Sequence, residues 1–353
     1  MPGDPTSLTS GSEAQAQAVA KAAAATSALD GLTLSSAPPA LPAPPPALPA
    51  PVVISPGAPH DATLLLLPGF TCSAESMAES WMPAISETLG DRGGRLKLVF
   101  LNAPEREVSC YGDERPRLQA WHDYFTDHGG DEGRPELEEE IDEAHVAWSR
   151  ARIHAAIDAE VALLGGDHSR VAVGGASQGC CMALDAALTH PAVLGGVFAS
   201  FGQVYACTLR ALGAAPGGAA SKRGLRLVAF HGAGDRCIAA SLAMRSYAQL
   251  IDLGFSALRL HLEPYLGHCE SNEAESALLC DALASWGLVP QESEGEAPPT
   301  PARPGGERGA ELFFFPSPPR GARELGAEAQ VVMPVMPGAP LHCHQGGSVP
   351  PGS

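Results

Sequence analysis

A serine in a glycine-flanked turn is the first candidate for chemistry in this sequence. Ser177 lies in Gly-x-Ser-x-Gly at residues 175–179, between a β-branched run and a helical pattern. At a sharp strand-to-helix turn the glycines let neighbouring backbone approach, and the serine hydroxyl is exposed. The following helix directs its positive end toward the reacting carbon. We therefore predict that Ser177 is a nucleophile; the alternative is a glycine-rich turn that contains a serine by chance.

A serine hydroxyl needs a base within hydrogen-bond reach and a third group that orients the base. Asp235 follows the apolar run Leu225–Phe230, and His268 follows the run Ala257–Leu262. Both therefore lie in loops after strands, in the order serine, acid, histidine. Asp235 would fix the imidazole tautomer, and His268 would take the proton from Ser177 and pass it to the leaving group.

Other residues could fill these two roles. His231 and His261 lie nearer to strands than His268 does, although either could be a structural histidine. Asp252 and Glu270 are alternative carboxylates. Asp252 falls within a helical pattern and Glu270 lies two residues past the histidine, so Asp235 is preferred.

Two backbone N–H groups could stabilise the oxyanion that forms when a serine attacks a carbonyl. One belongs to Gln178, the residue after the nucleophile. The other is expected after an early strand, where Pro68 and Gly69 precede Phe70. We predict an oxyanion hole at Phe70 and Gln178, although Pro-Gly is also a common turn dipeptide.

The elements that position these residues form an alternating pattern. Short apolar runs alternate with helical patterns from Thr63 onward, which predicts the α/β class with a mostly parallel central sheet and helices on both faces. The expected strands are Thr63 to Leu67, Leu96 to Leu101, Val171 to Gly174, Gly195 to Ser200, Leu225 to Phe230 and Ala257 to Leu262. The expected helices lie near Leu137 to Leu164, Gln178 to Thr189, Ser241 to Leu253 and Asn272 to Trp286.

Several clusters contain residue types that can bind metal, but each fits a structural role better. The acidic residues at 136, 138, 139, 140 and 142 are expected at the start of the first predicted helix, where they favour its positive end. Cys180 and Cys181 are expected to be small buried side chains. The triplet His342-Cys343-His344 has no second cluster to complete a tetrahedral site. We predict no metal and no cofactor.

Composition divides the chain into three parts. Residues 1–59 and 289–353 are rich in Ala, Pro, Gly and Ser and lack sustained apolar periodicity, so we expect disordered tails. Residues 60–288 contain nearly all the long aliphatic runs and form one predicted catalytic domain. The Pro-rich stretch Pro38 to Pro51 supports an alternative hypothesis, a non-catalytic scaffold protein that recruits partners through its tails.

Charge and cysteine content limit the partners and the compartment. The formal net charge of −18 disfavours nucleic acid. Nine cysteines without a secretory leader favour a reducing, cytoplasmic location. The first residues are poor in acids but contain only Lys21 as a basic residue, so organelle targeting stays open. No apolar run approaches the ~18 to 20 residues that span a bilayer, so we expect no integral membrane segment and only peripheral membrane contact.

Taken together, the motifs resemble the acyl-protein thioesterase and phospholipase/carboxylesterase family of α/β-hydrolases. The resemblance covers about Asp61 to Gly287. It rests on Leu67-Pro68-Gly69-Phe70, Asn102-Ala103-Pro104, Trp121-His122-Asp123, residues 174–179, residues 231–235 and Gly267-His268.

This resemblance implies the α/β-hydrolase fold, a metal-free triad of Ser177, Asp235 and His268, and a substrate pocket near Trp121. It also implies cleavage of thioester or carboxylic ester bonds in acylated proteins or small acyl esters. The chain departs from the family at Pro68, where His is usual, and at Ala176, where Phe is typical. The triad residues survive these changes, and the shape of the acyl entrance is left open.

Overall fold

The computed structural model describes residues 49–130, 132–215, 217–291 and 311–312. Within them lies one eight-stranded sheet in the order β1-β3-β2-β6-β7-β8-β9-β10, and β4 and β5 form a separate antiparallel pair. Every neighbouring pair in the large sheet is parallel except β1 with β3. The predicted α/β class with a mostly parallel sheet is therefore confirmed.

The strands and helices have the following bounds. The strands are β1 (Val52–Ile54), β2 (Ala62–Leu67), β3 (Leu96–Phe100), β4 (Glu105–Glu107), β5 (Arg117–Gln119), β6 (Val171–Ala176), β7 (Gly196–Ser200), β8 (Leu227–Gly232), β9 (Leu258–Glu263) and β10 (Glu311–Leu312). The α-helices are α2 (Ala74–Leu89), α3 (Glu143–Leu163), α4 (Gln178–Thr189), α5 (Ala206–Ala214), α6 (Ala240–Asp252) and α7 (Glu273–Ser285).

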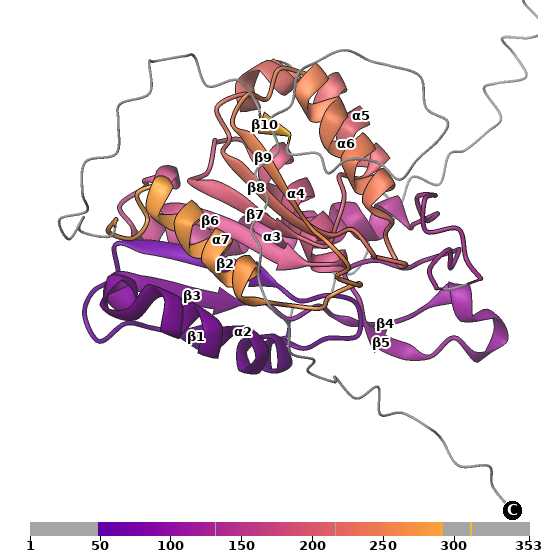
Figure 1. Cartoon of the computed structure of the whole chain (residues 1–353), viewed down its shortest axis with the longest axis horizontal. Coiled ribbons are helices and arrows are strands. Elements are labelled where there is room, and N and C mark those ends of the chain that lie inside the picture. The colour runs from indigo at the N-terminus through magenta and orange to yellow at the C-terminus, as the bar shows by residue number, and fades with distance from the viewer. Residues whose placement is uncertain (1–48, 131, 216, 292–310, 313–353) are drawn as a thin grey trace, which may run out of the picture. The chain divides into compact units, whose positions relative to one another are not determined.

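Helices cover both faces of the sheet (Figure 1). The alternation along β2 illustrates why. Leu65 and Leu67 belong to an apolar core with α3, α4, α5 and α6, whereas Leu64 and Leu66 belong to the core with α2 and α7. All four leucines are fully buried. Because burying one leucine contributes about 1.5–3 kcal/mol, the continuous apolar run fixes β2 at the centre of the layers.

The first predicted helix begins later than expected. α3 starts at Glu143, and the Asp142 carboxylate caps it by accepting from Ala144 N and His145 N at 2.9 and 3.0 Å. The preceding glutamates lie in an irregular loop, where Glu139 accepts from Thr126 Oγ1 and His128 N at 2.6 and 2.7 Å. Glu139 therefore stabilises the loop. Of the acidic residues at 136–142, Asp142 is the one that interacts with the positive end of the helix as predicted.

Ordered structure also extends beyond the predicted domain limits. β1 lies inside the segment 1–59 that was assigned to a tail, and Val53 pairs with Val99 of β3. The Asn102 side chain donates to Ala50 O and accepts from Ala74 N, at 2.9 and 2.7 Å. The predicted boundary at residue 60 is thus too late. At the other end β10, in the predicted tail 289–353, pairs with β9. Residues 1–48, 292–310 and 313–353 of the predicted tails lie outside the described residues, and His342-Cys343-His344 and the Pro-rich residues 38–48 are among them.

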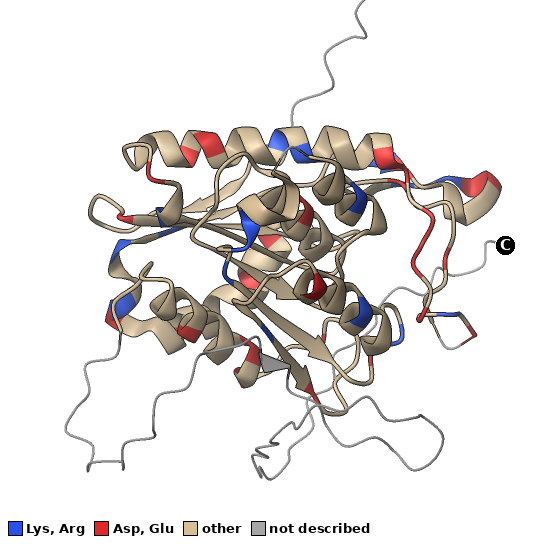
Figure 2. Ribbon diagram, turned by 90° about the horizontal axis from the view of Figure 1, so that it is seen from above, with Lys and Arg blue, Asp and Glu red and all other residues tan. Residues whose placement is uncertain are grey.

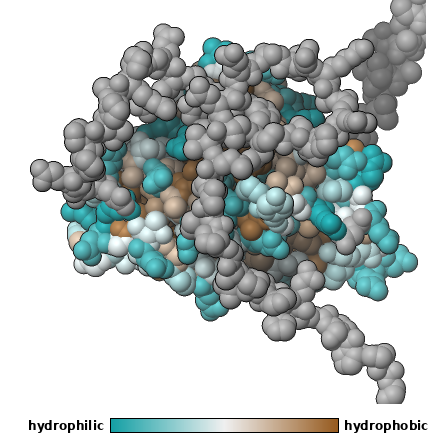
Figure 3. Space-filling model, in the orientation of Figure 1, coloured by the Kyte–Doolittle hydropathy of each residue, from teal (hydrophilic) through white to brown (hydrophobic). Residues whose placement is uncertain are grey.

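Charged and apolar residues are interspersed over the domain. Figure 2 shows acidic and basic residues scattered over the helices and loops, without a continuous basic surface in that view. In Figure 3 apolar residues are visible near the middle of the face, and hydrophilic residues are more common at its margins. Among the described helices, none has the length and apolar character needed to cross a bilayer.

Candidate active site

The turn between β6 and α4 holds Ser177 in a backbone conformation that side chains rarely adopt. Its φ is +53° and its ψ is −122°, and its N–H donates to Ser200 O at 2.9 Å. Such strain persists only where the surroundings fix it. A Cβ on Gly179 would lie 2.1 Å from Leu67 O, and one on Gly175 would lie 2.6 Å from the same oxygen. Both glycines are therefore required for the close approach of β2 to this turn.

The structure brings the three predicted triad residues into one chain of hydrogen bonds. His268 Nε2 lies 2.8 Å from Ser177 Oγ, and His268 Nδ1 lies 2.7 Å from Asp235 Oδ2. The other carboxylate oxygen of Asp235 accepts from Cys237 N and Ile238 N at 2.8 and 2.9 Å. The Asp235 side chain is fully buried. The acid is thus fixed by its own loop and faces the imidazole.

Electrostatics favour protonation of His268. Burial acts against its charged form, but the hydrogen bond to Asp235 and the neighbouring Cys269 thiol outweigh burial and raise the pKa of His268. The contact with Asp235 is the one that stabilises an imidazolium once the ring has accepted a proton.

The alternative histidines and carboxylates have other partners. His231 Nε2 faces Ile238 O at 2.8 Å and Asp235 Oδ2 at 3.3 Å, and burial lowers the pKa of this histidine. His261 lies 2.9 Å from Glu263. Glu270 accepts from Gly267 N at 2.7 Å, so it shapes the loop that carries His268. Asp252 lies at the end of α6. Of the histidines considered in the sequence, the one with a hydrogen bond to Ser177 is His268.

A cavity of about 380 Å³ opens beside Ser177 and His268. Its volume lies in the range of small-molecule sites, and most of its lining surface is apolar. Its apolar lining includes Phe70, Tyr124, Leu137, Ile141, Ile238 and Leu242. Leu137 and Ile141 belong to the loop that had been expected to be helical, so no pattern in the sequence indicated their role. Cys181, one turn along α4 from Ser177, also lines the cavity.

Of the two residues of the predicted oxyanion hole, Phe70 lines this cavity and Gln178 does not belong to its described lining. The Phe70 ring packs edge-on against Tyr124 with centroids 5.5 Å apart. Gln178 is the first residue of α4, where backbone N–H groups have no partner within the helix. Its fully buried side chain points elsewhere, accepting from Trp121 N at 2.7 Å and donating to His122 O at 3.1 Å.

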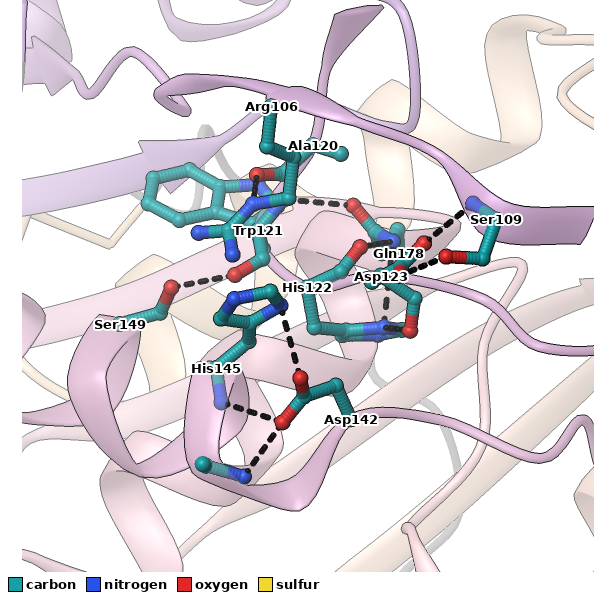
Figure 4. Close-up of polar contacts among 11 residues, drawn as sticks. Arg106, Ser109, Ala120, Trp121, His122, Asp123, Asp142, His145, Ser149 and Gln178 are labelled. Carbon is teal, nitrogen blue, oxygen red and sulfur yellow. Dashed lines mark hydrogen bonds and ion pairs between the residues drawn. The ribbon is translucent and has the colours of Figure 1, made fainter. Parts of the chain in front are cut away.

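Trp121 belongs to a network of polar contacts that includes Gln178 and Ser149 (Figure 4). The Trp121 ring is fully buried and does not belong to the described lining of the cavity, and the substrate pocket that the resemblance implies near Trp121 stays a prediction. Its Nε1 donates to Pro68 O at 2.8 Å, and the Trp121 carbonyl accepts from Ser149 Oγ. Trp121 thus connects α3 and Gln178 to the turn that carries Phe70. The sequence did not predict this positioning role, because the role depends on a hydrogen bond from the ring nitrogen to a carbonyl that is distant in sequence.

The neighbours of Trp121 extend the same support. Burial lowers the pKa of His122 to about 4, so its ring is neutral at pH 7 and lies 2.6 Å from the Tyr205 hydroxyl through Nε2. Asp123 accepts from Ser109 N at 2.7 Å and from Ser109 Oγ at 2.6 Å. Tyr205 lines the cavity, so this buried network also shapes its wall.

The fold and the site define a class of protein. A mostly parallel sheet with a strained serine turn after β6, an acid after β8 and a histidine after β9 is the arrangement of the α/β-hydrolases. Residues 48–276 match the phospholipase/carboxylesterase family, and the chain belongs to that family. The resemblance expected from the motifs is therefore confirmed.

Individual relatives agree with this assignment. Acyl-protein thioesterase 1 of Schizosaccharomyces pombe is 31% identical over 154 residues, which are 43% of this chain and 60% of that protein. Lysophospholipase-like protein 1 of Mus musculus is 28% identical over 248 residues, 69% of this chain and 94% of that protein. The crystal structure of Zea mays acyl-protein thioesterase 2 superposes with a TM-score of 0.55 at 23% identity, covering 67% of this chain and 98% of that one. The last comparison supports the fold.

Proposed function

We propose that this protein is a serine hydrolase that cleaves thioester or carboxylic ester bonds of acyl chains, with Ser177, His268 and Asp235 as its catalytic triad. The observation that carries the proposal is the pair of contacts at 2.8 and 2.7 Å on the two sides of the His268 ring, beside a mainly apolar cavity. Membership of the phospholipase/carboxylesterase family supports the same reaction class.

The geometry suggests the following steps. His268 takes the proton from Ser177 as Oγ attacks the acyl carbon, while Asp235 stabilises the imidazolium. The N–H groups of Phe70 and Gln178 stabilise the oxyanion, aided by the positive end of α4. His268 then protonates the leaving thiol or alcohol, which leaves an acyl-enzyme at Ser177. A water that gives its proton to His268 hydrolyses that intermediate.

The cavity indicates the substrate class. An acyl chain fits its apolar wall, and its carboxylates, Asp127, Glu138 and Glu139, are not accompanied by a lysine or arginine in the described lining. Anionic leaving groups are therefore disfavoured, and neutral or cationic ones are favoured. We propose an acylated protein or a small acyl ester as substrate, peripheral contact with membranes when the substrate is lipidated, and the cytoplasmic location that the cysteine content predicts.

Replacement of the nucleophile tests the proposal. Ser177→Ala should abolish labelling by a fluorophosphonate probe and lower hydrolysis of short p-nitrophenyl esters and acyl thioesters by at least about 1,000-fold. Ser285→Ala, at the end of α7, is the matched control and should keep both activities. Turnover by Ser177→Ala equal to that of the parent chain would refute the proposal. A series of esters and thioesters of increasing chain length then identifies the preferred bond and acyl length.

A further inference from the structure

Sulfur, nitrogen and oxygen ligands converge at the rim of the cavity. Three potential ligand atoms lie within 4.8 Å of one another, one each from Asp235, Cys237 and His268. Asp235 and Cys237 come from the loop after β8, and His268 comes from the loop after β9. Two neighbouring parallel strands therefore bring a thiol next to an imidazole and a carboxylate. The reaction proposed above uses the last two groups and has no role for the thiol.

A second thiol reaches the same place from the other loop. Cys269 follows His268 with a φ of +56°, and Cys237 and Cys269 both line the cavity beside His268. Both cysteines are exposed, whereas the Asp235 side chain beneath them is fully buried. An ion from solvent would thus meet the two sulfur atoms first.

These ligand types select a particular class of cation. Zn²⁺ binds cysteine sulfur, histidine nitrogen and carboxylate oxygen in tetrahedral sites of four ligands. Thiolates favour such soft or borderline ions over Mg²⁺ and Ca²⁺, which prefer oxygen ligands. Binding releases the thiol and imidazole protons to solvent and changes no oxidation state.

We propose that Cys237, Cys269, His268 and Asp235 form an inhibitory binding site for Zn²⁺. The inference rests on the proposed function, because it assigns a second use to the same histidine and aspartate. The two ring nitrogens of His268 contact Ser177 and Asp235. Coordination of either nitrogen to the ion breaks one of these contacts, so the nucleophile loses its base while the ion is bound.

A second group in the described part of the chain supplies an internal control. Ligand atoms of Asp158, His168 and His190 also lie within 4.8 Å of one another. His168 directly precedes β6, so this group lies at the opposite end of the strands from Ser177. One of its two histidines is paired with its aspartate, with His190 Nε2 3.1 Å from Asp158 Oδ1. Zinc bound there would leave the triad contacts intact.

The test measures inhibition and binding separately on the full chain, with the thiols kept reduced. ZnCl₂ is titrated against ester hydrolysis, each variant being normalised to its own rate without metal. CoCl₂ is titrated in parallel, and the thiolate-to-cobalt charge-transfer absorption reports sulfur coordination. Cys237→Ser and Cys269→Ser should each raise the half-inhibitory zinc concentration at least about tenfold and weaken the cobalt band. Chelation of the metal should restore the rate.

Two control variants identify the site. Cys110→Ser removes a thiol that lines the same cavity but is not one of the four proposed ligands, and His168→Ala removes a ligand of the distant group. Both should retain the zinc sensitivity of the parent chain. Equal inhibition of all four variants, or inhibition lost only in His168→Ala, would overturn the inference. Because the cobalt band needs no turnover, a chain that is inactive on every ester but shows a band dependent on Cys237 would refute the proposed function and support the metal site.

Discussion

Helix α4 and the irregular segment between β3 and α3 both line the cavity, but they are held in place by different forces. Residues 178–188 of α4 are buried, and the turn before the helix is fixed by backbone contacts with β2 and β7. The segment at 101–142 contains the β4–β5 pair and long loops, and side-chain contacts add to its backbone hydrogen bonds; for example, Arg106 Nε donates to Ala120 O at 2.8 Å. Ser177 is therefore positioned by a buried helix and two central strands, whereas the wall of the cavity depends on loops and on particular polar side chains as well.

The largest expected effect comes from breaking the backbone contact at the nucleophile turn. Gly179→Ala would place a Cβ 2.1 Å from Leu67 O, and neither backbone can yield without moving a central strand. We expect a loss of about 4 kcal/mol or more in the free energy of unfolding, measured by denaturant titration. Gly94→Ala is the control, since a Cβ there meets nothing within 4 Å. Equal stability of the two variants would contradict this account.

The same contrast explains what the sequence could predict. The periodic strands, the Gly-x-Ser-x-Gly turn and the order of Asp235 and His268 are local patterns, and the structure brings those residues together. The wall of the cavity had no such signal. Leu137 and Ile141 continue a helical spacing in sequence, yet Asp142 begins the helix after them because it caps the first free N–H groups. Short elements such as β1 depend on pairing with β3, which composition alone does not reveal.

A buried carboxyl group next to the Ser177 turn gives a second test, through the pH dependence of stability. Glu275 of α7 accepts from Ser200 Oγ, and the Ser200 carbonyl accepts the Ser177 N–H. Burial raises the pKa of Glu275 to about 7, against the opposing effect of the Ser200 hydrogen bond. A raised folded-state pKa stabilises the fold below the unfolded pKa of about 4.5, and this contribution is lost as the pH rises through about 7.

We therefore expect the free energy of unfolding to fall by up to about 3 kcal/mol between pH 4.5 and pH 8 through this group. Denaturant unfolding across this range measures the effect. Glu275→Gln should remove that part of the pH dependence, while Glu273→Gln, exposed in the same helical turn, should retain it. An unchanged pH profile in Glu275→Gln would show that the carboxyl group does not titrate in this range.

A moderate effect is expected where the two regions meet, at Trp121. Trp121→Phe keeps a ring in the buried site but removes the donor to Pro68 O. We expect kcat to fall about tenfold with a smaller change in KM, because the Phe70 N–H is less well placed for the oxyanion. Steady-state kinetics on one ester separate the two constants. Trp148→Phe is the matched control, because its buried Nε1 has no hydrogen-bond partner in the described structure. A change confined to KM would argue against a positioning role.

The smallest effect is expected from the loop wall. Leu137→Ala removes part of the apolar lining without touching the triad. The ratio of kcat/KM for long over short acyl esters should fall about threefold to tenfold, since a half-exposed leucine contributes less than a fully buried one. Leu163→Ala, an exposed leucine outside the cavity, should leave that ratio unaltered. A ratio that fails to respond to Leu137→Ala would place the acyl chain elsewhere.

The order of the strands along the chain also determines when each residue of the site is synthesised. Ser177 follows β6, but His268 follows β9, three positions further across the sheet and 91 residues later in the chain. Domains are synthesised from the amino end at about 5–20 residues per second. A growing chain can therefore form β2, β3 and β6 around Ser177 several seconds before His268 is synthesised. If His268 is the base, we expect the nascent chain to be inactive toward esters until β9 and the loop after it have been made.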